Sequence, residues 1–543
     1  MKKLLFTLTL LILAAYALLY AVPQHLMQRE TAAAAPTFAL LTPAPEPQPP
    51  VKNGIDALWL LPYRTENDAE RARIMREHGA AVMRGETPRE LADILLPQPQ
   101  NDELTCGHNG IECLAAVRAK PQAYRAATEK YAALAANVAQ LAAYDTFAQR
   151  GWPNDTDNLA ELRLPAFQHL LHAPAAAAAT EWINGQHTAA FARLCRSIRT
   201  GRALLNGRPG LIYPMIGNAL IRKNTELAAA MLAEQPEQAN RLPQECDGMF
   251  APLTPAEQSI CPAMRDEFHS AANLYRTLAR SPYQTAQSLT AKLAADNGQA
   301  DSQWLVGIVP IPTMNAGHTA ARTAYAYAPA CLPQAAAQLA QDQAVSLPPP
   351  QPDGFTAKWA CLADAQGCIL SSTALPDHTA YARRLQDTAM QQRAFQAALE
   401  LYRLPKTQRR AALQTTLAAH ATPARRLTWD EATRTLTFPH YTQTGNNNTP
   451  APIPLRLEYT PPADKGRLKN RLHRFSDGLP FPCRANVRCQ NPNRVRGLRH
   501  TPCVTAKGRP RLRRDDVSES AISTQPKPLS VIPAQSGIFS DIR

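Results

Sequence analysis

The sequence predicts a mainly α-helical protein with an N-terminal single-pass membrane anchor, a multi-helix body, a small C-terminal β-hairpin element and a disordered tail. Three observations lead to this fold class. An unbroken apolar run opens the chain, apolar residues recur at helical spacing through an alanine-rich middle, and only 6% of residues are aromatic. Such a composition favours helices that pack closely through small side chains.

The apolar run covers residues 4–22 behind Lys2 and Lys3 and contains no charge. A helix that rises 1.5 Å per residue crosses a bilayer core of about 30 Å with this length. The lysines place the N-terminus in the cytoplasm by the positive-inside rule. Residues 23–543 are therefore expected outside the cytoplasm, with residues 4–22 in the membrane.

A cleaved signal peptide is the alternative to an uncleaved anchor. Cleavage needs small residues directly behind the apolar core. Leu19 stands two positions before Ala21 and makes a poor cleavage site, and the next small-residue cluster, 32–35, lies well beyond the apolar run. The uncleaved anchor is therefore the preferred interpretation.

Changes in composition divide the rest of the chain. Residues 36–50 hold six prolines and no glycine, which predicts a polyproline II stalk within a linker. The predicted organisation is a cytoplasmic end at 1–3, the anchor at 4–22, a Pro-rich linker at 23–50, a helical body at 51–375, helices with a β-hairpin at 376–460, and a basic disordered tail at 461–543.

Helical periodicity runs through the body. Thr65 to Asp68 has the character of a capping box and opens a helix that ends near Met83. After Pro121, apolar or small residues recur at steps of three and four, which predicts one long helix with a heptad-like seam. Gly201 is among the glycines expected at joints between helices. Further helices are predicted at 158–172, 175–205, 211–234, 255–280, 283–296, 333–343, 377–402 and 405–419.

The hydrophobic period changes near residue 426. Residues 426–429 and 436–438 flank a polar turn and predict a β-hairpin, with residues 453–459 as a third strand. A small β-element therefore closes the helical body.

The formal net charge of +14 belongs to one segment. Residues 465–514 contain 15 Lys or Arg and a single acid, Asp477, so the remainder of the chain is neutral. Outside the cytoplasm, an Arg-rich segment without apolar periodicity is expected to be a solvated tail, and no nucleic-acid partner is expected. Residues 529–543 resemble a translated bacterial intergenic repeat, which implies that the tail was acquired by read-through.

Eight cysteines lie in the body, an even number that favours disulfides in an oxidising compartment. Short separations with intervening turn residues predict local pairs. Cys195 and Cys331 are then left over, either paired across the core or buried as free thiols. The predicted pairs are Cys106–Cys113, Cys246–Cys261 and Cys361–Cys368.

Catalytic and cofactor motifs are absent from the sequence. It contains no GxSxG, P-loop, GxGxxG or HExxH motif, and the body has no CxxC or CxxH spacing for zinc. His169 and His172 share a helical face, but a metal site needs a third ligand, so a solvated face is the better interpretation. No cofactor, metal or catalytic residue is predicted.

Five segments of the body are DALWLL at 56–61, CLAAVRAKPQAYR at 113–125, YPMIGNAL at 213–220, SICPAMRDEF at 259–268 and LTWDEATRTLTF at 427–438. On these segments the chain resembles a loose group of uncharacterised proteobacterial inner-membrane or periplasmic proteins. The resemblance implies an anchor, an Ala-rich helical body with paired cysteines and a closing hairpin, and it implies no activity. The basic tail departs from the group.

Two functions agree with these features. The first is a membrane-tethered helical scaffold of the bacterial envelope that binds an envelope protein partner. The second is an envelope hydrolase of unfamiliar type, whose site would come together only in three dimensions. A large exposed apolar patch would favour the scaffold, and a pocket with perturbed carboxylates or histidines would favour the hydrolase.

Overall fold

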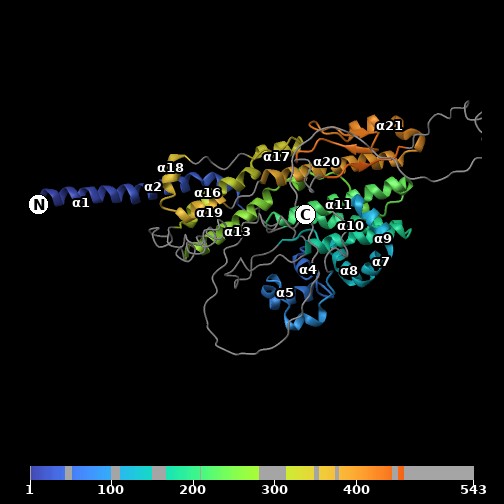
Figure 1. Ribbon diagram of the computed structural model, residues 1–543, viewed down its shortest axis with the longest axis horizontal. Helices are drawn as coiled ribbons and strands as arrows, with labels where there is room; N and C mark the ends of the chain where they lie inside the picture. Colours follow the sequence, from blue (N-terminus) through green and yellow to red (C-terminus); the bar gives the residue numbers. More distant parts are fainter. Residues whose placement is uncertain are drawn as a thin grey trace, which may run out of the picture. The chain divides into compact units, whose positions relative to one another are not determined.

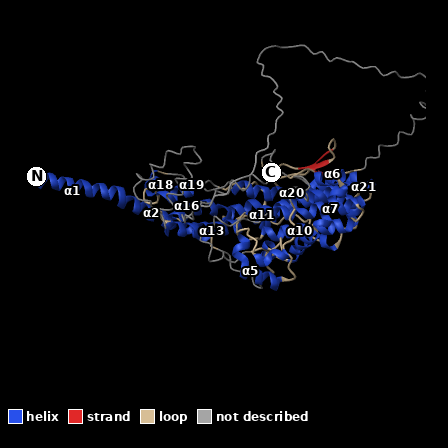
Figure 2. Ribbon diagram, turned by 60° about the horizontal axis from the view of Figure 1, so that its bottom comes forward, coloured by secondary structure: helices blue, strands red, loops and turns tan. Residues whose placement is uncertain are grey.

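Helices dominate the computed structural model of the chain, as Figures 1 and 2 show, which confirms the predicted mainly helical class. All of the described residues belong to one compact unit. The helix predicted at 283–296 and the tail predicted at 461–543 lie outside them. The structure describes residues 2–42, 52–99, 110–148, 167–207, 210–280, 314–347, 354–373, 378–442 and 450–457.

The chain begins with a long helical stretch. α1 (Lys2–Tyr16) passes through a π-helical turn, η1 (Ala17–Ala21), into α2 (Val22–Ala33), and α3 (Ala35–Leu40) follows. The large apolar side chains of α1 are exposed, and this stretch is long and apolar enough to cross a membrane.

The linker predicted at 23–50 is wrong over its described part, because α2 and α3 occupy it. Pro23 and Pro36 stand in the first turns of these helices, and Pro23 directly follows the π-helical turn η1, so neither proline prevents helix formation. Met27, Ala34 and Leu41 are buried in the body. The predicted stalk from residue 43 to residue 50 lies outside the described residues.

The predicted capping box at Thr65 is displaced by two residues. Asn67 is the N-cap of α5, and its side chain accepts a hydrogen bond from the Glu70 N–H at 3.0 Å. Thr65 instead accepts a hydrogen bond from the buried Arg71 at 2.9 Å. The elements of this region are α4 (Ile55–Trp59), α5 (Asp68–Met83) and the 3-10 helix η2 (Arg89–Ile94).

The long helix predicted after Pro121 is broken at Tyr131. The Tyr131 backbone (φ −106°, ψ 20°) leaves helical geometry, and its side chain is buried against Ala173. The predicted seam survives on the second part, where Leu134 and Val138 are buried. The segments are α6 (Gly110–Ala119), α7 (Pro121–Lys130), α8 (Ala132–Gln140) and the 3-10 helix η4 (Leu141–Ala143).

The core centres on α11, in which nearly every residue is buried. α10 and α11 cross at Gly201 and Gly217, where a Cβ atom on Gly201 would lie 2.9 Å from the Gly217 carbonyl oxygen. Gly201 therefore lies at a helix crossing inside α10, and its predicted role as a joint is wrong. The helices around this crossing are α9 (Phe167–Ile183), α10 (His187–Leu205) and α11 (Ile212–Glu234).

Further helices complete the body, and α20 packs along α11. The helix predicted at 255–280 is interrupted, because Ser259 leaves α12 in an extended conformation. The elements are η6 (Pro236–Asn240), η7 (Gln244–Cys246), α12 (Pro255–Gln258), α13 (Cys261–Arg280), α16 (Ala316–Tyr327), η9 (Ala328–Cys331), α17 (Pro333–Ala340), α18 (Phe355–Ala360), α19 (Ala365–Thr373), α20 (His378–Arg403) and α21 (Lys406–Ala419).

A small antiparallel sheet, red in Figure 2, follows the helices in the order β1-β2-β3. Its strands are β1 (Thr428–Asp430), β2 (Thr435–Thr437) and β3 (Ile453–Pro454). Leu436 pairs with Trp429 on one side and with Ile453 on the other, and β3 contacts α11 and α20. The predicted hairpin and third strand are confirmed, although β3 is shorter than expected.

Candidate functional site

The N-terminal helical stretch is fixed to the body by four charged residues, which we call the junction cluster. Glu30 comes from α2, His318 and Arg322 come from α16, and Asp364 lies between α18 and α19. Asn315 caps α16 by accepting a hydrogen bond from the His318 N–H at 3.0 Å. Because Arg322 follows four residues later, it lies on the same helical face as His318.

His318 lies between two carboxylates. Its Nδ1 is 2.8 Å from Asp364 Oδ2, and its Nε2 is 3.2 Å from Glu30 Oε2. Arg322 Nη1 donates to Glu30 Oε1 at 3.0 Å. The side chains of His318 and Asp364 have no exposed surface. Two acids therefore face two bases, and the cluster is neutral overall when His318 is protonated.

Backbone groups also hold the Asp364 carboxylate. It accepts hydrogen bonds from the Asn315 N–H at 2.8 Å, the Gly367 N–H at 3.2 Å and the Thr319 hydroxyl at 3.0 Å. A Cβ atom on Gly367 would collide with this carboxylate and with the Thr319 hydroxyl. The close approach of α19 to α16 therefore requires glycine at residue 367.

The pKa values in the cluster shift in opposite directions. Burial acts to lower the pKa of His318, but the hydrogen bonds to Asp364 and Glu30 outweigh burial, so the pKa is raised. Burial acts to raise the pKa of Glu30, but the hydrogen bond from His318 and the charge of Arg322 outweigh it, so that pKa is lowered. Both shifts favour the charged forms.

The geometry of the cluster suits attachment better than catalysis. A hydrolytic triad needs a hydroxyl or thiol hydrogen-bonded to the histidine. The Thr319 hydroxyl donates to Asp364, and both ring nitrogens of His318 already face carboxylates. A protonated imidazole in this arrangement cannot take a proton from a nucleophile.

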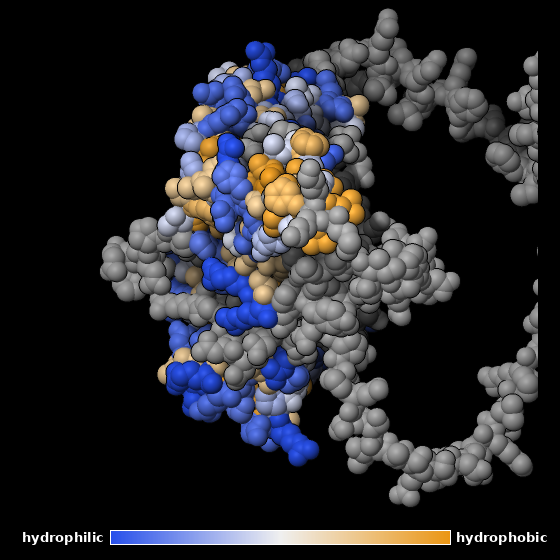
Figure 3. Space-filling view, turned by 90° about the vertical axis from the view of Figure 1, so that its left-hand side faces the viewer, coloured by the Kyte–Doolittle hydropathy of each residue, from blue (hydrophilic) through white to orange (hydrophobic). Residues whose placement is uncertain are grey.

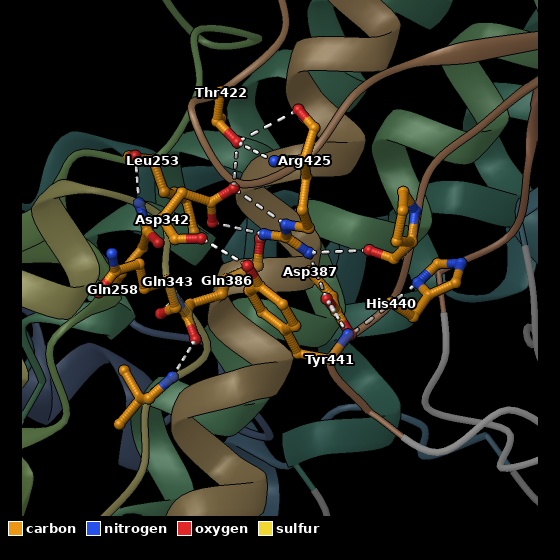
Figure 4. Close-up of polar contacts among 12 residues, drawn as sticks. Leu253, Gln258, Asp342, Gln343, Gln386, Asp387, Thr422, Arg425, His440 and Tyr441 are labelled. Atoms are coloured by element: carbon orange, nitrogen blue, oxygen red, sulfur yellow. Dashed lines mark hydrogen bonds and ion pairs between the residues drawn. The ribbon is translucent and has the colours of Figure 1, made fainter.

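A second buried cluster joins the β-element to the helices (Figure 4). Arg425 donates to Asp342 through Nε at 2.9 Å and through Nη2 at 2.6 Å, and to Asp387 through Nη1 at 2.7 Å. The Tyr441 ring lies 4.0 Å from the guanidinium carbon. Burial and the charge of Arg425 lower the pKa of nearby His440, outweighing the effect of Asp387. With a neutral His440 and all guanidinium donors of Arg425 bonded, this cluster is a structural connection between the β-element and the helices, which we call the structural lock.

A third buried carboxylate, Glu226, joins α11 to three other segments. It accepts hydrogen bonds from the Gly110 N–H at 2.9 Å, the Gln391 side chain at 3.0 Å and the Ala451 N–H at 3.0 Å. Arg222 lies 3.3 Å away on the same helix. These contacts connect α6, α20 and the start of the β3 segment through one side chain.

A cavity of about 350 Å³ lies elsewhere, beside η7 and α20. Its charged lining residues are Asp247 and Arg403, and Phe250 forms part of its wall. Among the described residues that line it, none is a histidine, serine or threonine. The cavity therefore lacks the acid–base pair that would favour the hydrolase.

The predicted cysteine pairing is partly wrong. Cys361 and Cys368 lie at disulfide distance as predicted. Cys246, however, pairs with Cys195 in α10, because η7 packs against that helix. Cys261 pairs with Cys331, because α13 packs against η9. The Cys246–Cys261 pair is therefore incorrect, and the two cysteines left over in the prediction each belong to one of these long-range bridges.

Cys113 is also disulfide-bonded. The other cysteines of the described ranges pair among themselves, so the partner of Cys113 lies outside those ranges. Cys106 lies outside them as well, and the predicted Cys106–Cys113 pair stays a prediction.

Within the described ranges, no group of three or more His, Cys, Asp and Glu side chains is placed to hold a metal ion. The side chains of His169 and His172 lie outside what the structure describes.

The sequence did not predict the junction cluster, because Glu30 and His318 are 288 residues apart and neither belongs to a spaced motif. The only local signal is the Asn315 cap in front of His318.

No family model, curated protein or solved structure matches the chain. The resemblance to proteobacterial envelope proteins therefore stays a prediction, and the function has to be argued from the residues described above.

Proposed function

We propose that this chain is a single-pass protein of a bacterial inner membrane, with residues 4–22 as an uncleaved span and the helical body as a periplasmic scaffold. One observation carries the proposal. The exposed apolar helix α1 continues through η1 directly into α2, and α2 packs against the body through the buried Pro23 and Met27. An apolar helix that is exposed along its length needs an apolar environment, and a bilayer supplies it.

The contacts of α2 support retention of the N-terminal segment. Cleavage at the small-residue cluster 32–35 would remove Met27, which is 4% exposed, and Glu30, which bonds His318 and Arg322. His318 and Arg322 would then lose their partner from α2, and His318 would stay buried. Breaking a buried charge cluster in this way is strongly destabilising.

A scaffold agrees better than a hydrolase with the chemistry of the body. Its buried charges, at His318, Arg425 and Glu226, are used in contacts between elements. The 350 Å³ cavity has no paired acid and base of the kind that a hydrolase needs. We therefore assign to the body the binding of an envelope protein partner.

Reporter fusions after residue 60 test the topology. A reporter that is active only in the periplasm should work at this junction, because Lys2 and Lys3 keep the N-terminus in the cytoplasm. Activity of a strictly cytoplasmic reporter at the same junction would overturn the proposal.

Crosslinking of the full-length protein in membranes, followed by purification, tests the scaffold role. A fusion that carries α1 alone is the control. If the full-length protein recovers no envelope protein beyond those that the control recovers, the scaffold role is contradicted.

A further inference from the structure

We propose that α18 and α19 form a second, interfacial contact with the bilayer, beside the membrane-spanning helix. The inference rests on the proposed function, because it takes residues 4–22 as the span. It adds a lipid-binding surface on the body itself. The protein would then contact the membrane twice, through the span and through α18 and α19 in the headgroup layer.

Large hydrophobic side chains are exposed on this helix pair. Outside residues 4–22, the large hydrophobic residues that the structure shows as exposed are few, and most lie within residues 354–373. Phe355 is 75% exposed, Leu362 is 55% exposed and Ile369 is 39% exposed. The ring of the half-buried Trp359 lies 5.8 Å from that of Phe355. We call these four residues the α18–α19 patch.

Phe355 and Trp359 share one face of α18. They are four residues apart, the spacing of one helical face, and the exposed Leu362 follows in the turn after the helix. Ala360, at the end of α18, and Ala363, between α18 and α19, are buried against Met27 of α2. The helix therefore presents one face to the body and an apolar face to its surroundings.

The contact with α2 fixes the depth of the patch. Met27 follows the end of the span at residue 22 by five residues, which corresponds to about 7.5 Å along a helix. The interfacial layer extends about 5–8 Å beyond the hydrocarbon core on each side. Figures 1 and 2 both show α18 beside α2, at the end of the body from which α1 extends. Figure 3 looks onto that end, where the exposed apolar helix α1 projects from the body, and shows hydrophobic residues with hydrophilic residues around them.

The charges of the helix pair agree with a lipid surface. The only acid within residues 354–373 is Asp364, which is buried in the junction cluster. Lys358 is exposed next to Trp359, and aromatic residues with a neighbouring lysine are typical of segments that lie at the headgroup level. The Cys361–Cys368 disulfide links the end of α18 to α19, which limits how far the two helices can move apart.

Trp359 reports on this contact in the full-length protein. The chain contains six tryptophans, so the emission of Trp359 is obtained by subtracting the Trp359→Phe variant from the wild type. Both proteins are reconstituted into phosphatidylcholine–phosphatidylglycerol vesicles, with or without lipids brominated near the headgroup. Brominated lipid should quench the Trp359 component, aqueous iodide should leave it unchanged, and the quenched component should be lost in Trp359→Phe.

A pair of surface variants supplies the control. Phe355→Asp should make Trp359 accessible to iodide and shift its emission to longer wavelength. Leu95→Asp alters a hydrophobic side chain that is 40% exposed but lies outside the patch, and it should leave the Trp359 signal as in the wild type. Both residues are at the surface, so neither substitution removes a core contact.

The outcomes separate the inference from the proposed function. Quenching of Trp359 by iodide in the wild type would overturn the inference. Protection from both quenchers would also overturn it, because a second copy or a protein partner would then cover the patch. If the wild-type protein fails to float with the vesicles at all, the span itself is wrong, and the proposed function fails first.

Discussion

His318 and Asp364 are charged groups without exposed surface, and each is matched by an opposite charge within hydrogen-bonding distance. Taking such groups out of water is expensive, and a buried pair is often no more stabilising than apolar residues of the same volume. Removing one partner is different, because the other charge stays buried and unpaired. The junction cluster therefore specifies how α2 docks, and single substitutions in it should have large local effects.

His318→Ala should loosen the attachment of α2. Loss of one partner of a buried ion pair costs about 3–5 kcal/mol, and here Asp364 would stay buried without the imidazolium. We expect the amide hydrogens of α2 to exchange faster with deuterium in the full-length protein, while those of α20 keep their wild-type rates. His25→Ala, at an exposed histidine of α2, is the matched control; equal exchange in the two variants would contradict the docking role.

The same exchange measurement should depend on pH. The pKa of folded His318 is raised above 6.5, so its stabilisation is complete below about pH 6.5 and is lost as the pH rises through the raised pKa. The pKa of folded Glu30 is lowered below 4.5, so its contribution is present above about pH 4.5 and is lost as the pH falls through the lowered value. The protection of α2 amides from exchange should therefore be greatest between about pH 4.5 and about pH 6.5. A constant protection from pH 5 to pH 9 would contradict the assignment of charge to His318.

Arg425→Lys should destabilise the β-element far more than Arg426→Lys. Arg425 is 2% exposed and donates to two carboxylates and to backbone carbonyls, a fork that a lysine cannot reproduce. The loss should be about 3–5 kcal/mol. Arg426 is the exposed neighbour, and its substitution should change the unfolding free energy by less than about 0.5 kcal/mol. Denaturant unfolding followed by Trp429 emission makes the comparison, and equal midpoints would refute the structural lock.

At the scale of elements, the sequence predicted those helices and strands whose formation depends on residues close together in the chain. The apolar spacing of α20 and α21 predicted both helices, and the change of period before β1 predicted the hairpin, because each element buries a face that its own spacing defines. Proline was less informative. The prolines from Pro36 to Pro50 predicted a linker, although a proline in the first turn, as at Pro36 of α3, is compatible with a helix. The break at Tyr131 depends on burial against Ala173, which no local pattern reveals.

Cysteine pairing also depends on contacts between distant segments, which local sequence does not reveal. Short separations favour closure, but Cys246 and Cys261 are held apart because each packs against a different distant segment. Among the bridges between described cysteines, the Cys361–Cys368 bridge, whose ends are seven positions apart in sequence, was predicted from spacing.

Non-reducing peptide mapping should recover the Cys195–Cys246 and Cys261–Cys331 peptides. In the chain-entropy model, a bridge that closes 51 residues contributes about 4 kcal/mol, and one that closes 7 residues contributes about 2 kcal/mol. Cys195→Ser and Cys246→Ser should lower the melting temperature equally, and the double variant should add little to either. Cys361→Ser should have a smaller effect. Recovery of a Cys246–Cys261 peptide from the wild type would show that the long-range pairing is wrong.

At the scale of the whole molecule, the account depends on how the apolar N-terminal helix is joined to the body. The sequence predicted the apolar N-terminal helix, because hydropathy is a local property. It did not predict that this helix continues into α2 and docks on the body, since docking depends on Glu30 meeting residues of α16. Attachment through a packed helix would limit the motion of the body relative to the membrane, whereas a proline-rich linker would permit it.

The intact mass of the protein in alkali-washed envelope membranes tests the central claim most directly. An uncleaved anchor that continues into the docked helix α2 predicts a chain that keeps residues 4–22 and stays in the membrane pellet at high pH. Leu11→Arg, in the exposed apolar helix, should release the protein into the supernatant with the body still folded. A wild-type chain that is found in the soluble fraction and begins after residue 21, or between residues 32 and 36, would contradict the account.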